Sequence, residues 1–146
     1  GGFLGYSTYF SKNTYKAAMM SACGAKEACR LVLDGEHPCA LAMIRPPGHH
    51  ATQDRYGGYC IFNNAAVAIR AMQSAGKIKT AMVVDWDAHA GNGTMRIFYE
   101  DPSVMTLSLH RDPHDFYPHD GYAHQIGRGN AARSARVEIE NIEHVA

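Results

Sequence analysis

The spacing of apolar and small residues along the chain predicts helices that alternate with strands. Over residues 13–33 these side chains recur at helical spacing, and the Asp34-Gly35 pair ends the pattern. The stripe consists of Ala18, Ala22, Ala25, Cys29 and Val32. A second helix is predicted over residues 63–74, because Asn63 can cap it and Gly76 suits its C-terminus. Each helix is expected to bury one face.

Short apolar runs between these helices predict strands. They are expected at residues 39–44, 80–85 and 104–110. A short helix is expected near residues 94–100, where Asp101-Pro102 stops it, and residues 137–140 alternate weakly as a further strand. Helices between parallel strands imply right-handed crossovers. The predicted fold class is therefore α/β, a three-layer sandwich with a mainly parallel sheet.

Composition narrows the class of protein. A chain of 146 residues that is 46% hydrophobic can form one compact domain. The formal net charge is zero and no basic block is present, which argues against direct nucleic-acid binding. The sequence has neither an apolar stretch of about twenty residues nor a signal peptide, so no membrane association is expected. The four cysteines lack C-x-x-C spacing, which is typical of a reduced, cytoplasmic protein.

Carboxylates and an imidazole follow the second predicted strand. Side chains on an extended chain alternate in direction, so Asp85, Asp87 and His89 can share one side. In open α/β sheets, ligands bind beyond the carboxyl ends of the strands. Carboxylate oxygen and imidazole nitrogen suit zinc or another first-row divalent metal. The alternative is that the carboxylates cap the next helix and His89 is an ordinary loop histidine.

Two adjacent histidines follow the first predicted strand. Pro46 and Pro47 stiffen the exit from that strand, and Gly48 permits a tight turn that presents His49 and His50. Such a pair can bind a metal, lie in solvent or transfer protons in tandem. A second Asp/His cluster follows the next strand, and this favours a catalytic role for the histidine pair. Histidine titrates near neutral pH, which suits proton transfer. The irregularly spaced histidines further along the chain do not favour a second metal site.

Four stretches occur in one order along the chain: residues 45–51 (RPPGHHA), 58–68 (GYCIFNNAAVA), 85–94 (DWDAHAGNGT) and 107–110 (LSLH). Together they resemble the zinc-dependent histone deacetylase superfamily, which also contains acetylpolyamine amidohydrolases and acetoin-utilisation proteins. The second stretch and Asn92 look closer to class II and bacterial members. The resemblance implies an arginase/deacetylase-like fold that is incomplete here. Residues 1–146 would be part of a catalytic domain that lacks its N-terminal start and C-terminal half.

The resemblance also implies roles for particular residues. Asp87 and His89 match two zinc (Zn²⁺) ligands, and the third ligand would lie outside this chain. The matched proton-handling residues and their partners are His49, His50, Asp85 and Asn92. A potassium (K⁺) site, largely of backbone oxygens, matches Asp85, Asp87, His89, Ser108 and Leu109. The walls of an acyl-lysine channel match Gly58, Tyr59, Phe116 and Tyr117. As core aromatics, the last three would instead only fill space.

The expected activity is hydrolysis of an acyl-amide by a zinc-bound water, with acyl-lysine or an acylpolyamine as substrate. His50 would act as base and acid, and Asn92 would supply no negative charge to favour its imidazolium form. A third ligand and an oxyanion-binding tyrosine have no counterpart here, so the chain alone is expected to be inactive. The alternative is a non-catalytic scaffold that binds acylated ligands; a homo-oligomer is compatible with either. The Pro-Pro-Gly-His-His turn argues against a two-manganese ureohydrolase.

Overall fold

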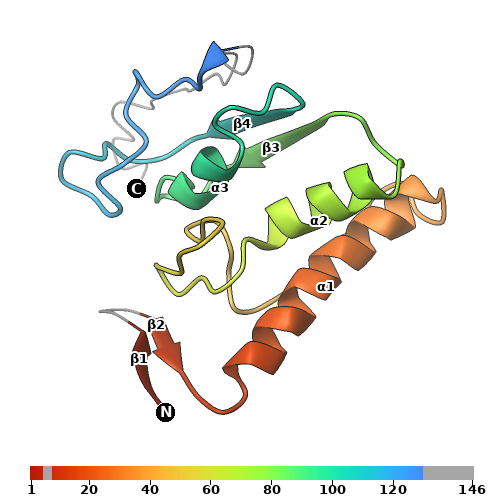
Figure 1. Cartoon of the computed structure of the whole chain (residues 1–146), viewed down its shortest axis with the longest axis horizontal. Coiled ribbons are helices and arrows are strands. Elements are labelled where there is room, and N and C mark those ends of the chain that lie inside the picture. The colour runs from red at the N-terminus through yellow and green to blue at the C-terminus, as the bar shows by residue number, and fades with distance from the viewer. Residues whose placement is uncertain (5–7, 130–146) are drawn as a thin grey trace, which may run out of the picture. The chain divides into compact units, whose positions relative to one another are not determined.

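The computed structural model describes residues 1–4 and 8–129, and the chain divides into two compact units, Gly1–Thr80 and Ala81–Ala146 (Figure 1). Among the described residues, no helix has the length and hydropathy that a membrane span requires. The strand predicted at residues 137–140 lies outside the described residues.

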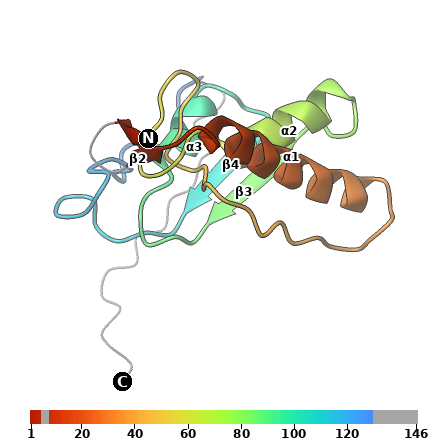
Figure 2. The ribbon, with the colours of Figure 1, turned by 90° about the horizontal axis from the view of Figure 1, so that it is seen from below.

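The first unit contains a small antiparallel hairpin and two packed helices. Strands β1 (Gly2–Leu4) and β2 (Thr8–Phe10) pair with Phe3 opposite Tyr9. Helices α1 (Thr14–Leu33) and α2 (Asn64–Ser74) lie side by side, as both ribbon views show (Figures 1 and 2). Small side chains let the two helix backbones approach. The buried residues on these helices include Ala18, Ser21, Ala22, Ala66, Ala68, Ile69 and Met72.

Both predicted helices of this unit are confirmed to within a residue at each end. Asn13 occupies the N-cap of α1, and Asp34 is its C-cap. At the C-terminal end, Arg30 bonds the carboxylates of Glu27, Asp34 and Glu36, and Lys77 pairs with Asp34. Hydrogen bonds from Lys77 and Arg30 hold the pKa of Asp34 below its usual range. This stabilisation is present above the carboxyl's ordinary pKa and is lost as the pH falls through its lowered value.

The prediction of a strand at residues 39–44 is wrong. The segment lies against α1, because a Cβ at Gly24 would come within 2.8 Å of Cγ2 of Ile44. Exposure alternates as in a strand only over residues 41–44, with Leu41 85% and Met43 90% exposed, whereas Cys39 and Ala40 are both exposed. A strand also needs backbone hydrogen bonds to a neighbour. In the described part of the first unit, no strand pairs with this segment.

The second unit is built on a parallel strand pair. Strands β3 (Ala81–Asp85) and β4 (Val104–Ser108) pair in parallel, with Ala81 opposite Val104 and Asp85 opposite Ser108. Their arrows point the same way in Figure 2. Helix α3 (Asn92–Ile97) lies in the connection between them, and begins and ends slightly before the predicted 94–100. These two strands and their parallel direction are therefore confirmed, although β4 ends before residue 110. Phe98, just after α3, is fully buried with Val104.

Replacing Phe98 by alanine should destabilise the protein strongly. Because the ring is only 2% exposed, Phe98→Ala leaves a cavity, and we expect a loss of about 3–5 kcal/mol in the free energy of unfolding. Urea denaturation of the full-length protein that contains this chain measures it. The control Phe3→Ala removes a ring that is 67% exposed and should cost about 1 kcal/mol or less. Equal losses for the two variants would contradict this account of the core.

Candidate active site

The predicted metal ligands lie in the loop that follows β3. The backbone N–H of Asp87 donates to Oδ1 of Asp85 (3.1 Å), and the backbone N–H of His89 donates to Oδ1 of Asp87 (2.8 Å). The carboxylates therefore fold their own loop. The N-cap position of α3 is Gly91, which has no side chain with which to cap the helix. Both interpretations of the Asp-x-Asp pair, metal ligands and helix cap, stay predictions.

The two predicted zinc ligands fit one ion. Nδ1 of His89 lies 2.9 Å from Oδ1 of Asp87, and the side chains are 40% and 50% exposed, respectively. Zinc binds such nitrogen and oxygen atoms at about 2.1 Å, so one ion can reach both. In the described part of the chain, no three metal-binding side chains gather in one place. The donor pair is therefore half of a site or less.

Two of the predicted channel residues lie beside His89. The ring of Phe116 stacks on the imidazole with centroids 4.6 Å apart and planes 13° apart, and Tyr117 meets it edge-on at 6.1 Å. The guanidinium of Arg111 lies 4.8 Å from the centre of the Phe116 ring. Phe116 is half-buried and Tyr117 is exposed, so neither ring is a core aromatic within this unit. An aromatic surface thus adjoins the predicted metal donors.

The residues matched to potassium binding lie at the carboxyl ends of both strands. The β3–β4 register sets Asp85 opposite Ser108, and the Leu109 amide donates to the Asp85 carbonyl (2.8 Å). The loop between Asp85 and His89 starts from the same point. The structure therefore brings together all five residues of this group, and the ion itself stays a prediction.

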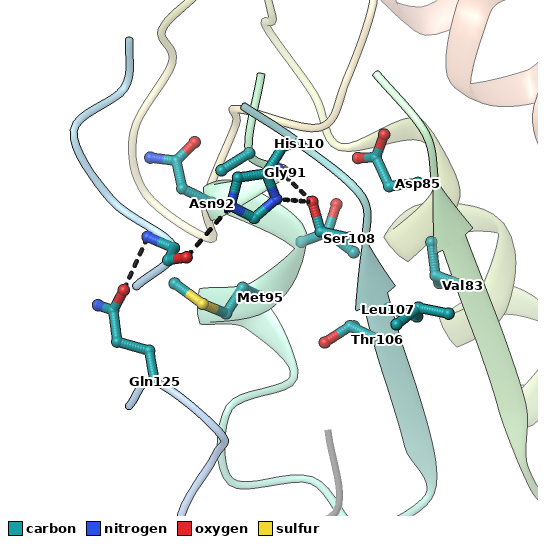
Figure 3. Close-up of a pocket in the computed structure, with 13 residues that line it drawn as sticks. Val83, Asp85, Gly91, Asn92, Met95, Thr106, Leu107, Ser108, His110 and Gln125 are labelled. Atoms are coloured by element: carbon teal, nitrogen blue, oxygen red, sulfur yellow. Dashed lines mark hydrogen bonds between the residues drawn. The ribbon is translucent and has the colours of Figure 1, made fainter. Parts of the chain in front are cut away.

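A pocket in the second unit adjoins these strand ends (Figure 3). Its lining comes from both strands, from α3 and from the loop after β4, and includes Asp85 and Asn92. His110 is buried; its Nδ1 lies 2.7 Å from Oγ of Ser108 and its Nε2 lies 3.1 Å from the Gly121 carbonyl. A Cβ at Gly121, whose φ is +92°, would press on Ala90 and His110. The sequence offered no signal for this contact, because the two residues it joins are eleven positions apart.

The two histidines of the first unit lie ring to ring. The His49 and His50 centroids are 4.0 Å apart, and His50 is only 7% exposed. The backbone N–H of His50 donates to Sγ of Cys60 (3.4 Å). A Cβ on Gly58, whose φ is +50°, would overlap the His50 ring and lie 2.8 Å from its Cγ. The absent side chain of Gly58 thus makes room for an imidazole, and the match of Gly58 to a channel wall stays a prediction.

Tyr59 continues the same loop with an exposed side chain. Its ring is 65% exposed, and its backbone N–H donates to Oγ1 of Thr8 (3.2 Å). It is therefore not a core aromatic of this unit. Its role as a channel wall stays a prediction. So does the convergence of His49 and His50 with Asp87 and His89 on one cation, because these pairs belong to different units.

Comparison with known proteins identifies the family. Residues 3–143 match the histone deacetylase domain, and the chain belongs to that family. It is 43% identical over 130 residues to a probable deacetylase of Methanothermobacter thermautotrophicus, covering 88% of this chain and 38% of that protein. It is 44% identical over 137 residues to an acetylpolyamine amidohydrolase of Mycoplana ramosa, covering 90% and 40%. The chain thus spans about two fifths of these relatives.

A solved structure supports the same assignment. The crystal structure of an acetylpolyamine aminohydrolase from Burkholderia pseudomallei matches with a TM-score of 0.83 at 39% identity, covering 91% of this chain and 38% of that one. The predicted fold class, an arginase/deacetylase-like α/β fold with a parallel sheet, is confirmed.

Replacing Gly58 by alanine should displace the His50 ring. The new Cβ would overlap the imidazole and hold a strained backbone, so Gly58→Ala should shift the His50 ring resonances and lower the melting temperature. NMR of the histidine rings and thermal unfolding measure the two effects. The control is Gly76→Ala, where φ is +68° but nothing lies within 4 Å. The Gly76→Ala variant introduces only the backbone strain and should leave the His50 resonances unchanged. Unchanged His50 resonances in Gly58→Ala would refute the contact between Gly58 and the His50 ring.

Proposed function

We propose that the protein containing this chain is a metal-dependent deacetylase, of which residues 1–146 form part of the catalytic domain. One observation carries the proposal. In a member of the histone deacetylase domain family, Asp87 and His89 present adjacent, exposed donor atoms beside the Phe116 ring. Exposed donors next to an aromatic surface suit a site where an ion and an uncharged acyl chain meet.

Asp87 and His89 would hold the zinc ion with a third ligand from outside this chain. When bound, zinc polarises the substrate carbonyl and lowers the pKa of a bound water to about 7. The stack with Phe116 would hold the plane of the His89 ring while its Nδ1 binds the ion. In this proposal Asp85, Asp87, His89, Ser108 and Leu109 also hold potassium at the strand ends.

The histidine pair would move the protons of the reaction. His50 accepts a proton from the attacking water and returns one to the departing amine. We propose that Asp85 partners His49 and that Asn92 partners His50. An amide partner adds no charge, so it leaves His50 free to act as a base. The buried His50 ring, packed on Gly58, would hold one orientation throughout.

The substrate class follows from the aromatic residues and the relatives. One relative is named for acetylpolyamine and the family for histones, and both names imply an acyl group on an alkylamine. Tyr59 and Tyr117 would line the four methylenes of a lysine stem or the similar stretch of a polyamine. Each methylene buried on binding contributes about 0.8 kcal/mol to the binding free energy. Acyl-lysine and acylpolyamine both fit this chemistry.

For the 146-residue chain by itself, a specific observation favours a second function. The described residues gather only two of the donors that a catalytic zinc site needs. We therefore propose that the isolated chain does not hydrolyse amides and at most binds acylated ligands as a scaffold.

The described cysteines are all free thiols, and a cytoplasmic location stays a prediction.

Activity should require both the metal and His50. A fluorogenic acetyl-lysine assay of the full-length protein should show turnover that a chelator abolishes. His50→Ala should lower kcat by about 100-fold or more, because general acid–base catalysis contributes 10²–10⁴-fold. The control is His37→Ala, which removes an exposed histidine just after α1. Turnover that survives the chelator would overturn the proposal.

The isolated chain should bind zinc weakly. With two protein ligands, we expect no stoichiometric binding at sub-micromolar zinc in a calorimetric titration. The double variant Asp87→Ala/His89→Ala should remove whatever weak heat is seen. Tight one-to-one binding would show that this chain alone completes the site.

A further inference from the structure

Two adjacent asparagines at the start of α2 hold the turn that carries the histidine pair. Nδ2 of Asn64 donates to the Pro46 carbonyl (3.0 Å) and to Oγ of Ser21 (3.0 Å). The Ser21 hydroxyl donates to the same Pro46 carbonyl (2.8 Å). The carbonyl three residues before His49 therefore accepts two side-chain hydrogen bonds, one from each helix of this unit.

Asn63 holds the other end of the turn. Its Nδ2 donates to the Ala51 carbonyl (3.1 Å), while its Oδ1 accepts the Ala66 amide (3.1 Å) as the N-cap of α2. One partner is an acceptor and the other a donor, so the orientation of the amide is fixed. The same side chain thus starts a helix and holds the residue after His50.

Between these two anchors the turn is tightly packed. A Cβ at Gly48 would lie 2.5 Å from the backbone nitrogen of Asn64, so the turn lies directly on the start of α2. The Ala51 amide donates to the Gly48 carbonyl (3.0 Å), and Ala51 is fully buried. Asn63 and Asn64 are buried as well. Buried side-chain amides with satisfied partners resist displacement, because a lost partner leaves a desolvated polar group.

We propose that Asn63 and Asn64 are positioning residues for His49 and His50. They fix the backbone on both sides of the pair, and through it the two imidazoles. The inference rests on the proposed function, in which these imidazoles transfer protons. A small displacement of a reacting group can lower a rate by about 100-fold.

The variant Asn63→Asp separates this role from helix capping. Aspartate keeps an oxygen to accept the Ala66 amide and is as good an N-cap as asparagine. It has no N–H to donate to the Ala51 carbonyl, and its second carboxylate oxygen would repel the Ala51 carbonyl oxygen. In the full-length protein we expect kcat to fall about 10- to 100-fold with KM within about twofold. The His49 and His50 ring resonances should move, while the helical circular dichroism should stay that of the wild type.

The matched control is Asn13→Asp, the same change at the N-cap of α1, where the native side chain makes no capping hydrogen bond. It should leave kcat and both ring resonances unchanged. If Asn63→Asp does not fold, Asn63→Ser, which also caps, takes its place. Wild-type kcat and ring resonances in the capping-competent variant overturn the proposal, as does a loss of kcat matched by lost helicity. If the wild type shows no metal-dependent turnover, the proposed function fails, and the ring resonances alone decide the positioning role.

Discussion

The parallel pairing of β3 with β4 is the constraint on which the second unit depends. With Asp85 opposite Ser108, both strands end at the same level, and the loops that leave them start side by side. The loop after β3 supplies Asp87 and His89, and the loop after β4 supplies Phe116. A register slip of one residue would turn Asp85 to the other face of the sheet. The site therefore depends on a backbone ladder as much as on its donor side chains.

The sequence predicted the elements whose signal is local. The sequence of helix α1 contains both a stripe of small and apolar residues at helical spacing and a stop signal. Strands β3 and β4 are apolar runs that pair with each other. The segment 39–44 has the same kind of apolar run, yet it is not a strand among the described residues. An apolar run alone does not make a strand, because a strand also requires a paired neighbour. The neighbour is a property of the fold and cannot be read from the segment.

The site divides in the same way. The pairs His49–His50 and Asp87–His89 were predictable because each is set by adjacent or alternating positions. Contacts between positions far apart in the sequence were missed. His110 reaches Gly121 through a positive-φ turn. Asn63 was predicted only as a helix cap, and its second hydrogen bond, to Ala51 twelve residues away, has no local pattern.

The two halves of the proposed chemistry are organised differently. The histidine turn of the first unit is buried and fixed by side-chain amides, so its geometry needs no ligand. Asp87 and His89 are half-exposed and bonded to each other, so an ion held by both would replace the hydrogen bond between them. Removing the metal should therefore leave the histidine turn intact. In the proposed function the proton-transfer groups would be preorganised, as catalysis requires, while the donors would remain accessible to the ion.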